Sequence, residues 1–126
     1  MSDHRRDSLV FLEDILFAIS RIEKYVGDMS LENFSANEMA IDAVVRNFEI
    51  IGEAARNLPE AIRVRHPAVA WREAVGLRNV LIHEYFGVDA EVLWHTAKSD
   101  LPALRADIER VFEAEKNDEP PKETSS

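Results

Sequence analysis

A chain of 126 residues, of which 46% are hydrophobic and 31% charged, has the composition of one soluble globular domain. Four glycines and five prolines are too few for the many turns of an all-β fold, and the absence of cysteine excludes a disulfide framework, a thiolate metal site and a cysteine nucleophile. No apolar run approaches the ~20 residues that cross a bilayer, and residues 1–8 lack the apolar stretch of a signal peptide, so we expect a cytoplasmic protein without membrane association.

The net charge of −9 argues against an extended nucleic-acid surface, because phosphate binding depends on lysine and arginine. Positive charge is nevertheless concentrated between Arg56 and His83, where five arginines stand against two glutamates. An enzyme that cuts RNA requires a local cationic site and not a basic surface everywhere. Alternatively, these arginines are only solvated side chains. The acidic balance elsewhere also suits a basic protein partner.

Residues 8–26 are predicted to form the first amphipathic helix. Apolar residues recur there at three- and four-residue spacing, which places them on one face: Leu12, Ile15, Leu16, Ile19, Ile22 and Val26. Gly27 is expected to end this helix. Residues 30–34 are predicted to be a connector of about one helical turn.

A second long helix is predicted to begin at Ser35. Glu38 follows three residues later, and this pattern has the form of a capping box. Leu58 and Pro59 are expected to end the helix. Residues 59–66 then form a short helix or a turn.

The third main helix is predicted to run from Pro67 to Phe86, because proline is tolerated in a first turn and Gly87 is placed to terminate it. Its apolar residues occupy most of the circumference: Trp71, Val75, Leu77, Val80, Leu81, Ile82 and Phe86. Such a helix must be covered on most sides. A second subunit could cover one of them, but a central helix of a compact bundle would show the same pattern.

Asp89 is the expected N-cap of the last helical stretch. Pro102 lies inside this stretch and is predicted to kink or split it near Ser99 or Asp100. From Glu115 the chain is polar and contains prolines. We therefore predict an all-α domain over residues 1–114 and a disordered acidic tail over residues 115–126.

Arg78 and His83 are the residues of the third helix best suited to chemistry on RNA. Histidine can accept the proton of the 2′-hydroxyl or deliver one to the leaving 5′ oxygen near neutral pH. The guanidinium offers a fork of donors to the phosphate as charge develops, and the reaction requires no metal or other cofactor. Asn79 shares a helix face with His83, and Tyr85 lies nearly in register with Arg78.

The Arg–His spacing is weak evidence by itself, since it arises readily by chance in a chain with 11 arginines and four histidines. The purely structural interpretation is a buried His83 bonded to a backbone carbonyl and an Arg78 that forms a surface ion pair with an acid.

The other titratable candidates are weaker. His66 is expected in an exposed loop, His95 has no evident acid partner, and His4 lies near a frayed terminus. Glu49 and Glu53 share a helix face, but no histidine follows at the spacing of a carboxylate-bridged metal site. We therefore predict no metal site.

Several segments, in order along the chain, are more specific than this spacing. They are FEIIGEAARNLP (residues 48–59), PAVAWREAVGLRNVLIHEYFGVDAEVLW (residues 67–94) and DLPAL (residues 100–104). Together with the first helix they resemble the HepT-like group of the HEPN superfamily over roughly residues 7–112. The family motif is an arginine, a polar residue, a later histidine and, in HepT-like members, a tyrosine. Arg78, Asn79, His83 and Tyr85 match it.

This resemblance implies an all-α, up-and-down bundle of four to five helices that forms a homodimer, with two motifs facing one another in a cleft. It also implies a metal-independent endoribonuclease with Arg78 and His83 as catalytic residues, Asn79 in support and RNA as substrate. Such a protein is the toxin of a type VII (HEPN/MNT) toxin–antitoxin system. Its partner is a minimal nucleotidyltransferase antitoxin that uses ATP to adenylylate the motif tyrosine, here Tyr85.

A bulky anionic nucleotide on Tyr85 would block RNA by steric exclusion and charge repulsion. Two alternatives stay open. The chain could instead be a non-catalytic, nucleotide- or substrate-binding subunit of a minimal nucleotidyltransferase, or a structural dimer.

Overall fold

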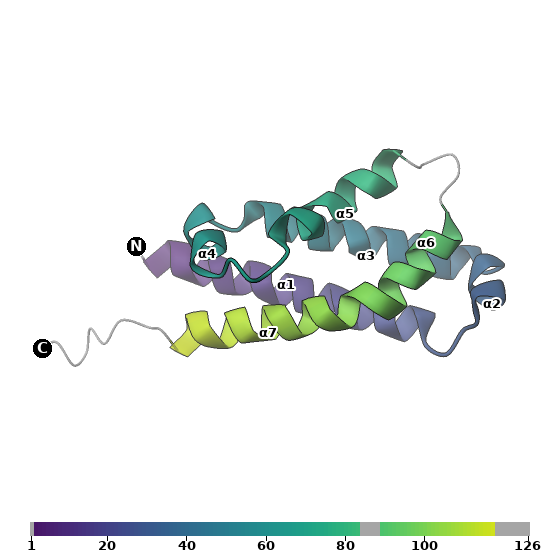
Figure 1. Cartoon of the computed structure of the whole chain (residues 1–126), viewed down its shortest axis with the longest axis horizontal. Coiled ribbons are helices and arrows are strands. Elements are labelled where there is room, and N and C mark those ends of the chain that lie inside the picture. The colour runs from purple at the N-terminus through teal and green to yellow at the C-terminus, as the bar shows by residue number, and fades with distance from the viewer. Residues whose placement is uncertain (1, 84–88, 118–126) are drawn as a thin grey trace, which may run out of the picture.

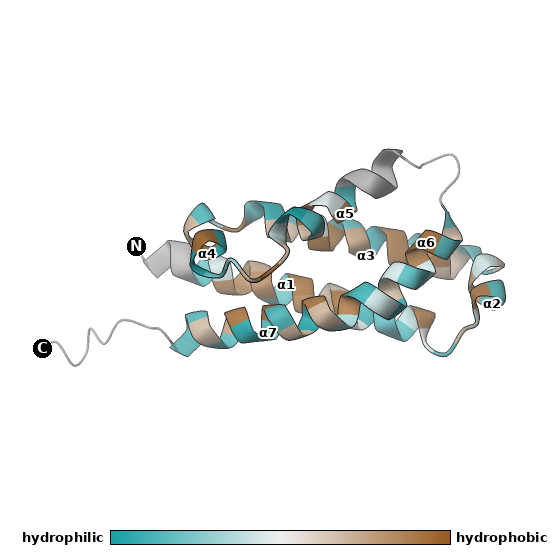
Figure 2. Ribbon diagram, in the orientation of Figure 1, coloured by the Kyte–Doolittle hydropathy of each residue, from teal (hydrophilic) through white to brown (hydrophobic). Residues whose placement is uncertain are grey.

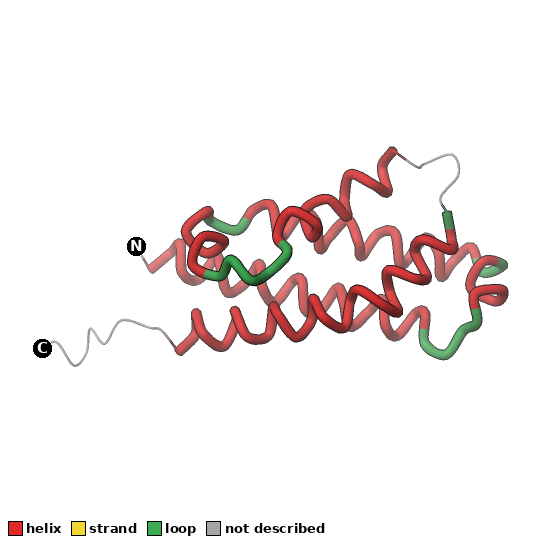
Figure 3. Tube along the Cα trace, viewed as in Figure 1, coloured by secondary structure: helices red, strands yellow, loops and turns green. Residues whose placement is uncertain are grey.

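In a computed structural model of the chain, the described residues, 2–83 and 89–117, contain helices and no strand (Figures 1 and 3). For residues 2–5 and 79–83 only the course of the backbone is described. The elements in chain order are α1 (Ser2–Val26), α2 (Leu31–Ser35), α3 (Glu38–Asn57), α4 (Glu60–Arg65), α5 (Trp71–His83), α6 (Ala90–His95), the π-helical turn η1 (Thr96–Asp100) and α7 (Leu101–Asn117). The predicted all-α class is confirmed.

The long helices α1, α3, α5 and α7 run alternately in opposite directions, which is the predicted up-and-down arrangement (Figure 1). Helix α1 packs against α3 and α7, and α5 packs against α3. The short helices α2 and α6 lie together at one end of the bundle, and α4 lies at the other end (Figure 1). Among the described residues, no helix is both long and apolar enough to span a membrane.

The core lies between α1, α3 and α7, where the hydrophobic residues of each helix turn inward (Figure 2). The predicted stripe of α1 is confirmed, although Leu16 is only partly buried. Each fully buried aliphatic side chain contributes about 1.5–3 kcal/mol relative to an exposed one. The largest fully buried residues include Leu12, Ile15, Ile19, Ile22, Phe34, Phe48, Ile51, Leu93, Leu101 and Ile108. As predicted, α1 ends at Gly27, whose φ of 51° is a left-handed conformation that glycine adopts at little cost.

The start of α3 differs from the prediction. Asn37, not Ser35, is its N-cap, and the Asn37 side chain accepts a hydrogen bond of 2.9 Å from the Ala40 backbone N–H. Ser35 is the last residue of α2, which begins one turn earlier with Ser30 as its cap. The predicted one-turn connector is therefore a helical turn in its own right. Its last residue is Ser35, the residue that the capping-box pattern predicted as the cap of α3.

Helix α5 begins at Trp71, four residues later than predicted. The Trp71 backbone N–H bonds to the Val69 carbonyl at 2.9 Å, and the indole N–H donates to the His66 carbonyl at 2.8 Å. Both Val69 and Trp71 are buried. The chain therefore turns after α4 to bury two side chains before a helix begins, and Pro67 lies in this turn. The predicted end of the helix at Phe86 and Gly87 lies outside the described residues.

The predicted disturbance near Pro102 is confirmed and takes the form of η1. Proline has no N–H to donate, and in a regular helix its ring would clash with the carbonyl four residues earlier. The Leu101 N–H instead reaches back five residues to the Thr96 carbonyl, which widens the turn. Asp89 caps α6 as predicted and accepts bonds from the Glu91 and Val92 backbone N–H groups.

The predicted tail begins too early. Helix α7 continues to Asn117, and Glu115, placed in the tail by its polar sequence context, is only 6% exposed. Its carboxylate bonds to the side chains of Arg65 and His66, at the end of α4. A charge with such partners can be buried. Residues 118–126 lie outside the described part of the chain.

Candidate functional site

Arg78 lies at a close contact between α5 and α3. The contact is made at Gly52 of α3, where a Cβ atom would lie 2.6 Å from the Cβ of Arg78 and 2.8 Å from its backbone nitrogen. Those separations are shorter than carbon and nitrogen atoms tolerate, so only glycine allows the two helices to approach this far. The backbone position of Arg78 is therefore set by Gly52.

The Arg78 side chain forms an ion pair with Glu53, the residue after Gly52. The Nε atom of Arg78 lies 3.2 Å from Oε1 of Glu53, and the side chains are 36% and 47% exposed. The same carboxylate oxygen lies 4.0 Å from a terminal nitrogen of Arg56. Partly exposed pairs of this kind contribute about 0–1 kcal/mol to stability. An ion pair is also what the purely structural interpretation predicts for Arg78, so the pair alone does not distinguish the two.

Arg78 also borders an open cavity of about 500 Å³. Phe11 and Asp14 of α1 form one wall of the cavity. Helix α3 supplies most of the other lining residues: Arg46, Glu49, Ile50, Glu53, Ala54 and Asn57. The guanidinium is therefore accessible from solvent, and its surroundings mix apolar, cationic and anionic groups. Glu49 and Glu53 line this cavity together.

The other predicted site residues cannot be placed as fully. Asn79 and His83 lie in α5, one and five residues after Arg78, but their side chains are outside the described residues. Tyr85 lies outside the described residues altogether. The backbone thus places Arg78 and Asn79 on one turn of α5 and His83 on the next. Which of their side chains approach one another is left as a prediction.

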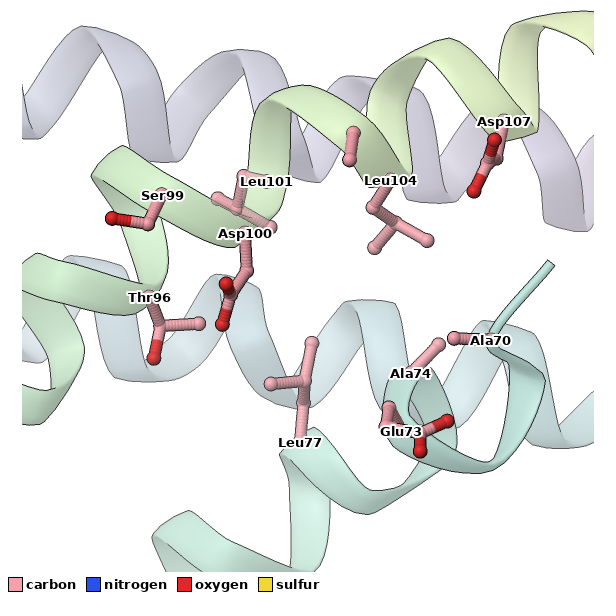
Figure 4. Close-up of a pocket in the computed structure, with 11 residues that line it drawn as sticks. Ala70, Glu73, Ala74, Leu77, Thr96, Ser99, Asp100, Leu101, Leu104 and Asp107 are labelled. Atoms are coloured by element: carbon pink, nitrogen blue, oxygen red, sulfur yellow. The ribbon is translucent and has the colours of Figure 1, made fainter.

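A second cavity, of about 370 Å³, lies between α5 and the η1–α7 segment (Figure 4). Leu77, Leu101 and Leu104 supply much of its apolar lining, and carboxylates stand around it: Glu73, Asp100 and Asp107. Asp107 forms an ion pair with Arg110. The excess of carboxylates disfavours a phosphate in this cavity. Because Leu77 precedes Arg78, α5 presents adjacent residues to two cavities of different character.

A cluster of polar side chains between the end of α4 and α7 was not predicted from the sequence. The ring Nε2 of His66 lies 2.7 Å from Oε2 of Glu115, and Arg65 contacts both carboxylate oxygens at 3.1 and 3.3 Å. His66 is thus partly buried and partnered, not an exposed loop residue as predicted. The partners are 49 and 50 residues apart, so no local pattern could reveal them.

His95 also has an acidic partner, Glu91, which was not predicted. Its Nε2 lies 3.8 Å from Oε2 of Glu91, one turn earlier on α6, with both side chains exposed. Among residues 6–78 and 89–117, whose side chains the structure describes, no group of three or more histidine and acidic side chains is arranged to hold a metal ion.

Most of the chain is similar in sequence to known ribonuclease-like proteins. The family model described as "Ribonuclease HepT-like" matches residues 15–111. "Probable ribonuclease HepT" of Thermococcus cleftensis is 42% identical over 107 residues, which cover 85% of this chain and 97% of the relative. "Putative RNase MJ1380" of Methanocaldococcus jannaschii is also 42% identical, over 85% of this chain and 98% of the relative.

A bacterial relative shows a similar level of identity. "Putative RNase TTE0752" of Caldanaerobacter subterraneus subsp. tengcongensis is 39% identical over 84% of this chain and 95% of the relative. No solved structure matches the chain. The family model matches more than half of this chain, and the alignments with these relatives cover nearly the whole length of each relative. The chain therefore belongs to the ribonuclease HepT-like family of the HEPN superfamily.

Proposed function

We propose that this protein is a metal-independent endoribonuclease whose catalytic residues are Arg78 and His83. The observation that carries the proposal is the position of Arg78. Its backbone is fixed against Gly52, and its guanidinium is partly exposed beside a cavity. The names of the relatives, all described as ribonucleases, support RNA as the substrate class.

The proposed reaction uses the RNA's own 2′-hydroxyl as the nucleophile. As the 2′ oxygen bonds to phosphorus, a base takes its proton. The bond to the 5′ oxygen breaks, and an acid supplies the proton that this leaving group needs. His83 is suited to either proton transfer near neutral pH. Arg78 donates to the phosphate oxygens, where negative charge accumulates in the transition state, and Asn79 supports the substrate or the end of the helix.

A homodimer would supply what one motif lacks. Cleavage needs a base and an acid at the same time, whereas each chain offers one motif histidine. Two copies with their α5 helices facing each other would provide two. The apolar circumference of α5, including the partly buried Val75 and Leu77, supports such an interface.

We further propose that the protein is the toxin of a type VII toxin–antitoxin pair and acts in the cytoplasm. Its partner would be a minimal nucleotidyltransferase that transfers an adenylyl group from ATP to the Tyr85 oxygen, releasing pyrophosphate. The modified tyrosine would carry a nucleotide two residues from His83, where RNA phosphate has to bind. Incubation with such an enzyme and ATP should add the mass of one adenylyl group to the wild type and none to Tyr85→Phe.

The decisive experiment is cleavage of RNA in EDTA by purified protein shown by mass to be unmodified. We expect cleavage by the wild type and a loss of about 100-fold or more in His83→Ala and Arg78→Ala, with folding checked by circular dichroism. Expression of the wild type alone should arrest growth, and His83→Ala should relieve the arrest. Intact RNA with the unmodified wild type would instead favour a non-catalytic binding subunit of a nucleotidyltransferase.

A further inference from the structure

Glu53 is the acidic residue closest to the proposed catalytic arginine. Its Oε1 lies 3.2 Å from Nε of Arg78, the nitrogen next to the aliphatic stem of the side chain. A guanidinium held through Nε can still present its two terminal nitrogens as a fork to a second anion. The contact therefore restrains the Arg78 side chain and leaves its two terminal nitrogens available to donate hydrogen bonds to a phosphate.

The same turn of α3 restrains Arg78 twice. Gly52 meets the Cβ and backbone nitrogen of Arg78, and Glu53, the next residue, meets its guanidinium. An arginine side chain has several rotatable bonds and loses rotamer entropy when it is fixed in one position. The backbone contact with Gly52 and the ion pair with Glu53 together reduce the number of orientations that the Arg78 guanidinium samples before substrate binds.

Glu53 also lies between two positive charges. Its Oε1 is 4.0 Å from Arg56 in addition to the 3.2 Å contact with Arg78. One carboxylate between two guanidiniums leaves a net positive charge at this point. It also reduces the repulsion that would push the two arginines apart.

We propose that Glu53 is a positioning residue for the ribonuclease reaction, which holds the Arg78 guanidinium where the scissile phosphate of RNA will bind. The inference rests on the proposed function of Arg78. A misplacement of about 1 Å in a group that stabilises the transition state can cost about 100-fold in rate. The carboxylate opposes phosphate binding electrostatically, so Glu53 lowers affinity for RNA while raising the rate of the bound complex.

The test is Glu53→Gln, assayed with a short synthetic RNA that the wild type cleaves. We expect kcat to fall by about 10-fold or more and KM to fall as well, because a negative charge beside two arginines has been removed. Loss of folded protein alone would lower the apparent kcat without lowering KM. Glu53→Asp, which keeps the charge on a shorter side chain, should recover part of kcat.

One variant controls for the change itself. Glu23→Gln breaks another pair between helices, that of Glu23 with Arg105 at 2.6 Å, with a similar glutamate exposure of 41%. It should keep kcat within about twofold of the wild type, since Glu23 lies outside the cavity that Arg78 borders.

A spectroscopic measurement tests whether Glu53 restrains the Arg78 side chain, and it does not depend on RNA cleavage. The Nε–Hε signal of Arg78, assigned by its loss in Arg78→Lys, should be distinct in the wild type and in Glu23→Gln. In Glu53→Gln it should move to the position of freely rotating arginines. An Arg78 signal unaffected by Glu53→Gln would overturn the inference, as would an unchanged kcat. If Arg78→Ala still cleaves RNA, the proposed function of Arg78 fails on its own, whatever the signal shows.

Discussion

Ser30, Asn37 and Asp89 act on the first turns of the helices that they precede. Each side chain accepts a hydrogen bond from a backbone N–H that has no partner within its own helix. These contacts determine at which residue α2, α3 and α6 begin. They also show why a capping pattern is ambiguous at the level of single residues. Ser35 has the right residue type and a glutamate three positions later, yet Asn37 performs the function.

Substitution at these two positions distinguishes the alternatives. Asn37→Ala should lower the free energy of unfolding by about 1 kcal/mol, because the Ala40 N–H loses its acceptor. Ser35→Ala should change it by less than about 0.5 kcal/mol, since Ser35 is exposed at the end of α2. Urea unfolding followed by circular dichroism measures both. A larger loss in Ser35→Ala than in Asn37→Ala would contradict the structure.

At the scale of elements, the contact between α3 and α5 depends on a glycine that sequence patterns do not single out. The segment that contains Gly52 supports the family resemblance, but its role appears only when α5 is placed against it. Gly76, on α5 itself, is different, because a Cβ there meets no described atom within 4 Å. The two helical glycines are therefore expected to respond oppositely to the same substitution.

Gly52→Ala should lower the free energy of unfolding by about 1–3 kcal/mol, because its methyl group would force α3 and α5 apart at Arg78. Gly76→Ala should raise it by about 0.5–1 kcal/mol, since alanine favours the helix and no described neighbour has to move. Thermal and urea unfolding of both variants provide the comparison. Equal destabilisation by both would show that helix packing at Gly52 is looser than the structure indicates.

Elements determined by nearby residues were predictable from the sequence, and those determined by distant contacts were not. The stripe of α1, its end at Gly27 and the break before Pro102 follow from spacing and backbone chemistry, and all are confirmed. The start of α5 was predicted four residues too early, because the bond from Trp71 to the His66 carbonyl and the burial of Val69 decide it.

The candidate site follows the same division. Arg78 could be identified from its motif, since the motif lies within one helix. Glu53 was considered only as a metal ligand and was rejected as one, because no histidine follows at the required spacing. Its contact with Arg78 could not be predicted, because Arg78 is 25 positions away in sequence and is brought to it by helix packing. The roles of His83, Asn79 and Tyr85 stay predictions.

At the scale of the whole molecule, side-chain contacts near the end of α7 hold α4 against the bundle. Glu115 is buried near the end of α7 and binds Arg65 and His66 at the end of α4. The turn that follows His66 leads directly into α5, and the His66 carbonyl accepts the indole N–H of Trp71. The cluster therefore connects the last described helix to the entry of the helix that carries Arg78.

Truncation tests this connection. A chain ending at Ala114, the predicted domain boundary, should lose about 1.5–3 kcal/mol of unfolding free energy relative to one ending at Asn117, because Arg65 and His66 lose their charged acceptor. The chain ending at Asn117 should match the full-length protein. Glu115→Gln in the full chain separates the loss of charge from the loss of helix. Equal stability of the two truncated chains would show that the cluster contributes nothing.

The attachment of α4 to α7 also orders events during synthesis. His66 leaves the ribosome before its acceptor exists, since Glu115 follows 49 residues later. At about 5–20 residues per second, roughly 2–10 s separate the two. During that interval α4 and the entry to α5 lack their bond to the rest of the bundle. The turn that leads into α5 is consequently among the last parts of the nascent chain to be fixed.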